Sequence, residues 1–461
     1  MDTSILRSML FVCIVLIGGL VMLGGQSHKP AALPLPIGDQ PIPTAQVLNQ
    51  SETVPVALPL PTATPVPVET TTDASTVAAP ALASSEPVHN TGAAPMVRTG
   101  PGGLSYPLGL AHLNLGVVGE LYQTDRETAL HMTHDVGFQW LRQHIRWSTI
   151  ETAPGVYAWD ELDALVADAE RHGVWLLVSI TAAPSWVTAD TRHGLPADPA
   201  TLAHFVGLLT ERYQGRIHAL EIWNGQNLAR EYGGNVTLED AGSYVELLAA
   251  CYQQIKNIDP QMIVVAGALS PTSTYDPAVA MPDIDYLRAM YQYNQGMMRN
   301  YFDVQGVEVN GTWHSPDAHW TDQPDQTGGW TNDSTFYFRH LERIYEVMQE
   351  AGVHQHQVWI TAYGWATRNT TPGYEFGNEV TLEQQRHYSV RAIERTYEYY
   401  PWVSNMFLWN LNSSVVQQQQ GLEPLHQEGS YSIVNADWTV RPAYQGIKDM
   451  IAKVRIAQGN W

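Results

Sequence analysis

Residues 160–180 read DELDALVADAERHGVWLLVSI and place an expected helix directly before an expected strand. Apolar residues recur with helical spacing up to His172, and Asp160 stands where a helix N-cap is expected. Gly173 follows at the position that a C′ glycine takes after a helix. Residues 174–180 then form a short apolar run, as a buried strand does. This stretch therefore predicts one helix–strand unit of an α/β fold.

The same alternation continues through residues 104–461, the expected folded part. Eight short apolar runs are expected strands, at residues 108–115, 140–145, 174–180, 219–223, 263–266, 304–309, 358–361 and 406–409. Helical spacing lies between them, at residues 160–172, 202–212, 241–258, 336–351 and 382–399, with Thr381 as an N-cap and Gly352 as a C′ glycine. This pattern predicts a (β/α)8 TIM barrel. A doubly wound sheet is the alternative, but no Gly-x-Gly-x-x-Gly follows the first strand.

Residues 1–26 are expected to form an N-terminal transmembrane anchor. Residues 8–27 carry no charge, are dominated by Leu, Ile, Val, Met and Gly, and are about long enough to cross a bilayer. A cleaved signal peptide is the alternative, although Leu23-Gly24-Gly25 is a poor match to the usual cleavage site. Either reading predicts that the rest of the chain lies at the cell surface or outside the cell.

Residues 27–103 are expected to be a disordered, Pro-rich linker. They hold 14 of the chain's 29 prolines and no Phe, Tyr or Trp. Without aromatic or periodic apolar residues, such a segment cannot offset the conformational entropy lost on ordering. A linker behind an anchor predicts a domain held away from the membrane.

The composition excludes several classes of function. The chain has 24 Lys and Arg against 46 Asp and Glu, a net charge of −22, which argues against a nucleic-acid partner. Cys13 and Cys251 cannot form a disulfide framework or a cysteine-based zinc site. His131 and His134 share a helix face but are expected on the outside of the barrel, so no metal site or cofactor is expected.

Three expected strands end in motifs that can be compared with known families. Residues 221–227 read EIWNGQN, residues 359–365 read WITAYGW and residues 406–412 read MFLWNLN. With Trp140-Leu141-Arg142 in the second expected strand, these motifs resemble the clan A glycoside hydrolases, in particular their cellulase-like and xylosidase-like retaining members. The resemblance covers residues 104–450 and implies an active site at the C-terminal ends of the barrel strands.

The catalytic pattern of that clan is broken in this chain. Its members carry the general acid/base in Trp-Asn-Glu after strand four and the nucleophile in Thr-Glu-(Tyr/Phe)-Gly-Trp on strand seven. Gly225 and Ala362 stand at these two positions. Retaining hydrolysis needs both carboxyl groups, about 5–5.5 Å apart. The resemblance therefore implies a catalytically degenerate member.

Other carboxylates are candidates for a relocated catalytic group. Relatives end strand six with His-Pro-Tyr-Gly, where this chain has Glu308-Val309-Asn310-Gly311. Glu308 is the best candidate because the barrel geometry is expected to aim it at the same cleft, with an outward-facing side chain as the alternative. Glu120 and Glu231 are weaker candidates, and solvated loop charges are the alternative for both.

The resemblance also implies residues that hold a sugar. Arg142 and Asn224 stand at substrate-positioning positions, and Trp409 matches the tryptophan on which a glycan ring stacks. Tyr363 and Trp365 flank the vacated nucleophile position. A core position for Trp409 and a buried salt bridge for Arg142 are the structural alternatives.

The expected loop at residues 311–332 is long, polar and rich in tryptophan. It carries Trp313, Trp320 and Trp330, and a loop of this length in a compact domain is usually functional or disordered. Trp313 is therefore a candidate for stacking on sugar, and plugging the barrel mouth is the alternative. The negative net charge favours a neutral poly- or oligosaccharide.

Three hypotheses remain from the sequence. The first is a membrane-tethered, extracellular carbohydrate-binding pseudoenzyme, which binds glycans without turnover. The second is an active glycoside hydrolase that uses a relocated carboxylate such as Glu308. The third is a structural or adhesive protein of the cell envelope, which does neither.

Overall fold

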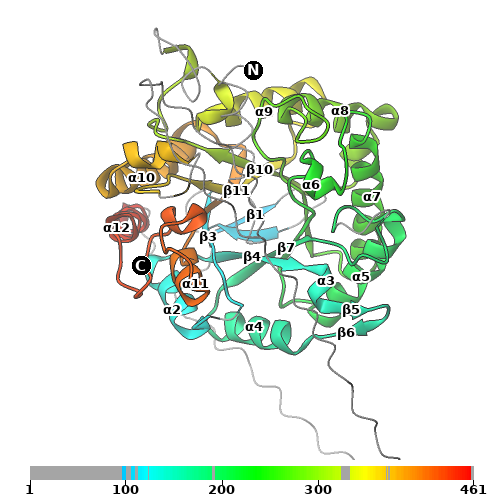
Figure 1. The fold of residues 1–461 in the computed structure, drawn as a ribbon, viewed down its shortest axis with the longest axis horizontal. Coiled ribbons are helices and arrows are strands. Elements are labelled where there is room, and N and C mark those ends of the chain that lie inside the picture. The colour runs from blue at the N-terminus through cyan, green and yellow to red at the C-terminus, as the bar shows by residue number, and fades with distance from the viewer. Residues whose placement is uncertain are drawn as a thin grey trace, which may run out of the picture. The chain divides into compact units, whose positions relative to one another are not determined.

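The computed structural model describes residues 96–99, 105–108, 113–122, 124–188, 193–322, 333–369, 371 and 374–457. Eight parallel strands close into a barrel (Figure 1). Each barrel strand is hydrogen-bonded to the barrel strands that precede and follow it in the chain, and the last pairs with the first. They are β3 (Asn114–Val118), β4 (Trp140–Arg146), β7 (Trp175–Thr181), β8 (Ala219–Ile222), β9 (Ile263–Ala266), β10 (Val304–Asn310), β11 (Gln357–Gly364) and β12 (Val403–Leu408). The predicted TIM-like α/β barrel is confirmed.

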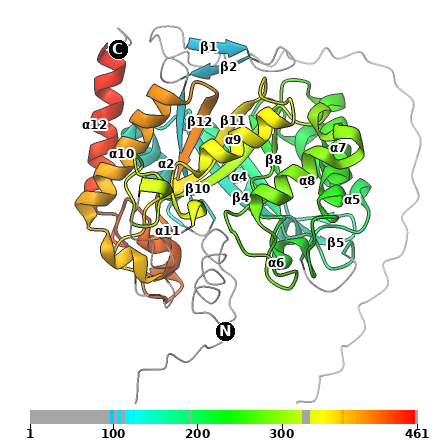
Figure 2. The same cartoon turned by 90° about the horizontal axis from the view of Figure 1, so that it is seen from above.

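Eight longer helices surround the barrel in the described part of the chain (Figure 1). They are α2 (Arg126–Val136), α4 (Asp160–Arg171), α5 (Pro199–Arg212), α7 (Ala241–Ile258), α8 (Asp283–Gly296), α9 (His340–Glu350), α10 (Leu382–Tyr399) and α12 (Pro442–Ala457). Shorter elements follow the strands: α3 (Trp147–Ile150), α6 (Ala229–Tyr232), α11 (Ser413–Gln419), β5 (Glu151–Ala153), β6 (Val156–Tyr157), η2 (Met297–Asn300), η3 (Trp320–Asp322), η5 (Ser334–Phe336), η6 (Glu375–Glu379) and η7 (Gln427–Ser430). The loops that carry α6 and α11 lie at one end of the barrel, where the strands end (Figure 2).

The N-terminal predictions fall largely outside the described residues. The expected anchor at residues 1–26 lies outside them entirely. Within the expected linker, β1 (Met96–Thr99) is described and pairs antiparallel with β2 (Ser105–Leu108). In the described part of the chain, no helix combines the length and apolar character that a bilayer crossing needs.

Local signals at the helix ends are mostly confirmed. Thr381 and Gln384 form a capping box at the start of α10, with Gln384 N–H donating to Thr381 Oγ1 at 3.1 Å. Gly173 and Gly352 follow their helices with φ of 66° and 70°, the left-handed conformation that favours glycine. Asp160 as an N-cap was wrong: Trp159 is already helical and its carbonyl accepts from Asp163 N–H, so Asp160 is the first residue of α4.

The first barrel strand lies further along the chain than predicted. The expected strand at 108–115 was set by alternating leucines, whereas the barrel pairs β4 with Gly116–Val118 of β3. Gly116 is required inside the barrel, because a Cβ there would lie 2.6 Å from Cδ1 of Phe407. Close packing of the interior therefore fixes this strand at residues whose apolar pattern is less regular.

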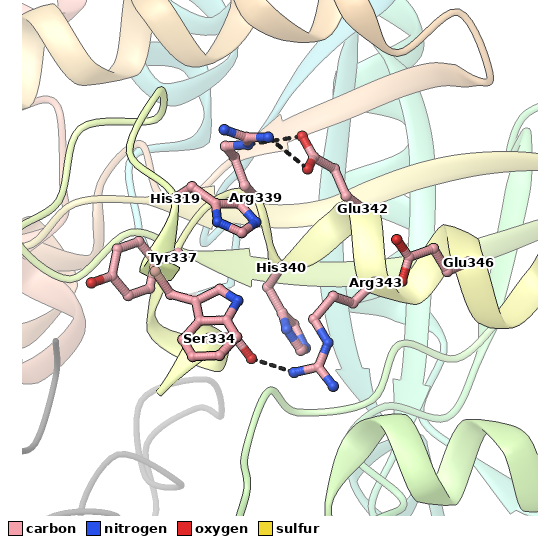
Figure 3. Close-up of a pocket in the computed structure, with 9 residues that line it drawn as sticks. His319, Ser334, Tyr337, Arg339, His340, Glu342, Arg343 and Glu346 are labelled. Atoms are coloured by element: carbon pink, nitrogen blue, oxygen red, sulfur yellow. Dashed lines mark hydrogen bonds and ion pairs between the residues drawn. The ribbon is translucent and has the colours of Figure 1, made fainter. Parts of the chain in front are cut away.

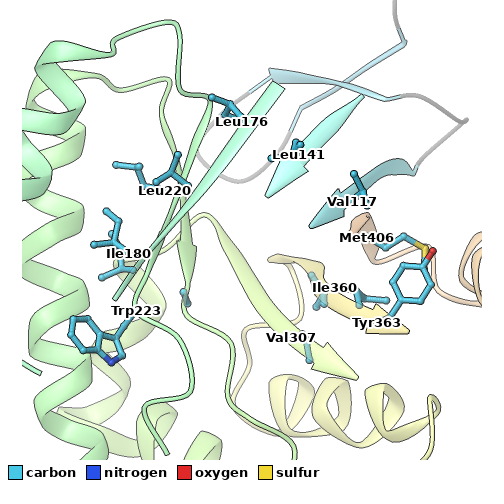
Figure 4. Packing of buried hydrophobic residues seen from close by; sticks show 14 of the residues in the cluster. Val117, Leu141, Leu176, Ile180, Leu220, Trp223, Val307, Ile360, Tyr363 and Met406 are labelled. Carbon is cyan, nitrogen blue, oxygen red and sulfur yellow. The ribbon is translucent and has the colours of Figure 1, made fainter. Parts of the chain in front are cut away.

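The core has two layers, one on each side of the sheet. Outward-facing side chains such as Ile180 and Leu220 point toward a helix, as Figure 4 shows, and Val117, Leu141 and Ile360 belong to the same outer layer. Inward-facing side chains, among them Trp140 and Trp359, fill the barrel itself. This division follows from the period of two along each strand, and it determines which residues reach the barrel mouth.

Candidate functional site

The strand ends bring four of the predicted site positions together inside the barrel. Val307 and Val309 of β10 belong to the outer layer, so Glu308 between them points inward. Its carboxyl group meets Arg142 of β4 and Asn224, which follows β8. Glu308 also pairs in register with Ala362 of β11, the vacated nucleophile position. The expected inward orientation of Glu308 is thus what the structure shows.

Arg142 is held by a buried ion pair with Glu221 of β8. Its Nε donates to Glu221 Oε2 at 2.8 Å and its Nη2 lies 2.7 Å from the same oxygen, with both side chains fully buried. Nη1 donates to the carbonyl of Thr361 at 3.3 Å. That carbonyl is available because the β10–β11 pairing skips Thr361, leaving it as a bulge. Arg142 therefore has the buried salt bridge that the sequence left open as its alternative role.

Asn224 bridges the two buried carboxyl groups. Its Nδ2 donates to Glu308 Oε1 at 3.0 Å and to Glu221 Oε1 at 3.3 Å. These two distances put Oε1 of Glu308 and Oε1 of Glu221 no more than about 6 Å apart, an upper limit that includes the spacing of a retaining catalytic pair. The space between them is filled by Asn224 Nδ2 and by Arg142, whose Nη2 lies 3.6 Å from Glu308 Oε1. These carboxyl groups share donors and do not face each other across an open gap.

Glu308 keeps one oxygen without a partner. Glu221 accepts hydrogen bonds at both oxygens, including one from Ala268 N–H at 3.2 Å, whereas Glu308 Oε2 has no hydrogen bond among the described residues. Burial raises the pKa of Glu308 to about 8; Arg142 and Asn224 lower it, and the charge of Glu221 raises it further. The raised pKa favours the protonated form of Glu308 near neutral pH, and this form can donate a hydrogen bond.

The vacated acid/base position has an unusual backbone. Gly225 has φ of 66°, and its N–H donates to the carbonyl of Ala268 at 2.8 Å. Trp223, two residues earlier, also has a positive φ of 66°. A residue with a side chain is strained in this conformation, so glycine is suited to the backbone of this loop. Gly225 also lacks the catalytic carboxyl group.

Trp409 and His144 complete the inner surface of the mouth. Trp409 is 3% exposed and belongs to the barrel-interior layer with Ala362. The ring of His144, on β4, stands edge-on to it at 6.2 Å between centroids. Neither Trp409 Nε1 nor either ring nitrogen of His144 has a hydrogen-bond partner among the described residues. Burial, together with the charge of Arg142, holds the pKa of His144 well below its usual value, so the ring is neutral.

The remaining predicted sugar contacts lie elsewhere. Tyr363 belongs to the outer layer and points toward the helices (Figure 4). Trp365 is buried in the same layer, with Nε1 donating to the carbonyl of His314 at 2.8 Å. Trp313 is half-buried and donates from Nε1 to His314 Nε2 at 2.7 Å. Trp313 also packs against the barrel-interior layer that contains Trp409. Tyr363 and Trp365 are therefore turned away from Arg142, Asn224 and Trp409, whereas Trp313 lies beside the inner layer.

Sequence reasoning missed two residues of this site. Glu221 lies within the apolar run of β8, and an ionisable residue in a buried strand signals a partner inside the fold. His144 stands two residues after Arg142 on the same strand, so the period of two places both on the inner face. Both signals were present in the printed sequence.

Two weaker candidates lie among acidic residues in the loops after the strands. Glu120 follows β3, and Glu428 lies in the loop after β12; burial raises the pKa of each to about 7, and the Glu428 charge adds to the effect on Glu120. Glu231 is only 18% exposed, pairs with Arg230 at 3.2 Å, and has a pKa raised mainly by burial. Glu231 is therefore a partly buried, ion-paired loop residue, and it lies outside the contacts of Arg142, Asn224 and Glu308 described above. No group of three or more His, Cys, Asp or Glu in the described residues is arranged to hold a metal ion.

A small cavity beside η5 and α9 has little free chemistry. It is lined by His319, Trp320, Ser334, Tyr337, Arg339, His340, Glu342, Arg343 and Glu346, most of which Figure 3 labels. Arg339 donates to both oxygens of Glu342, at 2.9 and 3.0 Å, and Arg343 contacts Ser334. His340 is paired with the buried Asp283 at 2.6 Å. These pairs indicate a structural role.

Comparison with known proteins places the barrel among glycoside hydrolases at the level of fold. No protein-family model and no curated protein sequence matches the chain. Solved structures do match. A family 39 glycoside hydrolase from the gut symbiont Bacteroides cellulosilyticus WH2 is 15% identical, with a TM-score of 0.53 over 76% of this chain and 66% of that one.

Two further solved structures give the same result. A GH5_18 protein from Streptomyces cattleya, in complex with GlcNAc, is 14% identical with a TM-score of 0.55, over 75% of this chain and 81% of that one. A glucosidase from Croceicoccus marinus is 12% identical with a TM-score of 0.52, over 78% and 70%. The chain spans just under two thirds of the family 39 enzyme. The expected resemblance to clan A glycoside hydrolases is confirmed for the fold.

Proposed function

We propose that this chain is a membrane-tethered, extracellular carbohydrate-binding barrel that does not hydrolyse its ligand by the retaining mechanism. The observation that carries the proposal is the state of the carboxyl groups at the mouth. Gly225 and Ala362 supply none, and Glu221 accepts donors at both oxygens. Glu308 alone retains a free oxygen, and a single acid cannot complete double displacement.

Unpartnered polar atoms at the mouth support a sugar ligand. Buried polar atoms nearly always have hydrogen-bond partners, yet Glu308 Oε2, Asn224 Oδ1, Trp409 Nε1 and the His144 ring have none among the described residues. They offer both donors and acceptors, which matches the hydroxyl groups of a sugar. The solved neighbour in complex with GlcNAc, a neutral sugar, fits this expectation.

The charge balance of the site favours a neutral ligand. Arg142 is engaged by Glu221, so its charge is compensated before any ligand arrives. Glu308 favours its protonated form near neutral pH because its pKa is raised to about 8, and His144 is neutral. An anionic sugar would find no uncompensated cation, and its burial without one is costly.

Ligand entry requires movement of the covering side chains. Arg142, Asn224 and Glu308 are fully buried, and the barrel-interior layer with Ala362 includes Phe336 and Tyr337 of the segment before α9. A sugar that reaches the free polar atoms therefore displaces part of this aromatic cover. Slow association is expected for binding that depends on such a change.

The second candidate function, slow glycoside hydrolysis, rests on one specific observation. Glu308 lies in register with the vacated nucleophile position and has a pKa near 8, as a general acid requires. In this case turnover of chromogenic glycosides is expected, and Glu308→Gln abolishes it. Under the first proposal, neither the wild type nor Glu308→Gln gives turnover. Glu308→Gln still binds sugar, because glutamine also presents a neutral donor and acceptor.

The test combines a glycan array with a chromogenic glycoside panel on the full chain. His144→Phe is the decisive variant, because it preserves an aromatic ring of similar shape while removing both unpartnered nitrogens. It is expected to fold normally and to lose about fivefold or more in glycan affinity, since a lost hydrogen bond to a buried neutral group is worth about 1 kcal/mol or more. Tyr399→Ala, an exposed aromatic on α10, is the control. A chain that neither binds nor hydrolyses glycans supports the structural or adhesive alternative instead.

A further inference from the structure

An open groove lies beside the ends of β4 and β7. It has a volume of about 340 Å3, toward the lower end of the usual range of ligand sites. Its lining combines aromatic, apolar and polar side chains: Trp147, Glu151, Pro154, Trp186, Val187, Ala200, Thr201 and His204. None of these residues belongs to the mouth site described above.

The floor of the groove is rigid and its single carboxylate is already bound. Trp147 is 1% exposed, and its ring stacks on Phe205 at 5.4 Å with an interplanar angle of 21°. Its Nε1 donates to Glu151 Oε2 at 2.7 Å, while Gly155 N–H donates to Glu151 Oε1 at 2.9 Å. The groove therefore needs no cationic ligand to satisfy Glu151.

Trp186 forms one wall and is the one tryptophan among the large, clearly exposed apolar side chains of the described residues, at 42%. It sits in a short turn in which Val187 N–H donates to the carbonyl of Pro184 at 3.1 Å. The carbonyl of Val187 accepts from Ala197 N–H at 2.8 Å, which ties the turn to the segment before α5. A half-exposed indole on a fixed backbone suits a ligand with one apolar face and polar edges.

The groove opens at the same end of the barrel as the mouth site. Trp147 directly follows β4, the strand that carries Arg142 and His144. His144 and Trp147 are three residues apart, so their Cα atoms lie within about 11 Å of each other. The two sites therefore lie within the length of a short oligosaccharide.

We propose that the Trp186 groove is a second sugar-binding subsite, which stacks a ring of the same neutral oligosaccharide whose other end enters the barrel mouth. This inference rests on the proposed function and adds to it: the ligand is an oligosaccharide rather than a monosaccharide. Trp186 supplies the stacking face, and Thr201 and His204, on the first turns of α5, supply polar groups at its edge.

Calorimetric titration of the full chain with cello- and xylo-oligosaccharides, from monosaccharide to hexasaccharide, tests the proposal. For wild type, affinity is expected to rise with chain length. Trp186→Ala is expected to abolish that rise, with a loss of about tenfold for the hexasaccharide and no change for the monosaccharide. Trp186→Phe is expected to restore part of it, and Tyr399→Ala is expected to have no effect.

The outcomes separate this inference from the proposed function. If Trp186→Ala keeps the full chain-length dependence while His144→Phe loses sugar affinity, the mouth binds sugar and the groove does not. If wild type binds neither the cello- nor the xylo-oligosaccharides, both proposals fail. A proline-rich peptide of residues 55–68 is the third ligand to titrate. If wild type binds this peptide but no sugar, and Trp186→Ala no longer binds it, the groove is a peptide site and the sugar subsite is overturned.

Discussion

Arg142 is the residue on which the barrel mouth most depends for stability. Its guanidinium group compensates Glu221 and lies 3.6 Å from Glu308 inside the barrel. Arg142→Met is expected to lower the free energy of unfolding by about 3–5 kcal/mol, because it leaves a buried carboxylate unpaired. Urea denaturation measures the effect. The double variant Arg142→Met with Glu221→Gln is expected to recover much of the loss, and equal instability of the two would show that the ion pair is not the cause.

Gly225 gives a second prediction at the residue scale. Its φ of 66° is accessible to glycine but strained for most residues. Gly225→Ala is expected to cost about 1 kcal/mol of stability, measured by thermal unfolding. Gly225→Asn is the matched control and is expected to cost less, because asparagine tolerates this conformation. An equal cost for both variants would point to a steric clash and not to backbone strain.

The strain at Gly225 also bears on attempts to restore activity. A glutamate at this position would begin from an unfavourable backbone, and at Ala362 it would enter a buried layer beside Glu308. Two adjacent buried carboxyl groups raise each other's pKa. Reintroducing the two family carboxylates is therefore expected to require changes in the loop after β8 as well.

At the scale of elements, the described part of the loop after β10 is tied to α10 by ion pairs. Asp317 accepts from Arg391 Nε at 2.7 Å and from Arg395 Nη1 at 2.9 Å. These side chains are partly exposed, so Asp317→Asn is expected to cost no more than about 1 kcal/mol of global stability. Amide exchange in residues 311–322 of this variant is expected to accelerate. The rate of sugar association is expected to rise as well.

Hydrogen exchange by mass spectrometry, with stopped-flow binding, provides both readouts for Asp317→Asn. Glu394→Gln is a suitable control, because Glu394 contacts the same Arg391 at 3.4 Å but belongs to the same helix. It is expected to leave exchange in the loop unchanged. Unaltered loop exchange in Asp317→Asn would show that other contacts hold the loop.

How far the sequence predicts the structure differs between elements. α10 was predicted with the observed bounds, because Thr381 and Gln384 form a local capping box. The orientation of Tyr363 was not predictable, since the bulge at Thr361 changes which neighbours face inward along β11. Glu308 was placed correctly because β10 alternates regularly. Local chemistry thus predicts the helix ends and strand faces, whereas pairing irregularities depend on the neighbouring strand.

The whole molecule carries an unusual set of buried acids, which sets its dependence on pH. The pKa of Glu308 is raised to about 8, and those of Glu120 and Glu428 to about 7, all mainly by burial. Between pH 4.5 and these values the folded chain keeps protons that the unfolded chain has released. The contribution of these three groups to stability therefore falls as pH rises across this range, by at most about 1.4 kcal/mol per pH unit for each group.

Acid conditions act in the opposite direction. Hydrogen bonds from Arg212 and Arg391 lower the pKa of Asp163 and Asp317, so their contribution is lost as pH falls through these lowered values. Burial also lowers the pKa of four histidines, His144, His218, His314 and His356, so the folded chain loses further stability as pH falls below about 6.5. The melting temperature is therefore expected to be highest near pH 6.5 and to decline toward pH 8. Glu308→Gln is expected to flatten the decline, because glutamine has no proton to lose. Glu383→Gln, a change at an exposed ion pair, is expected to alter only the acid side. A melting temperature that still rises between pH 6.5 and pH 8 would show that these carboxyl groups are ionised in the folded chain and would remove the basis for a neutral sugar site.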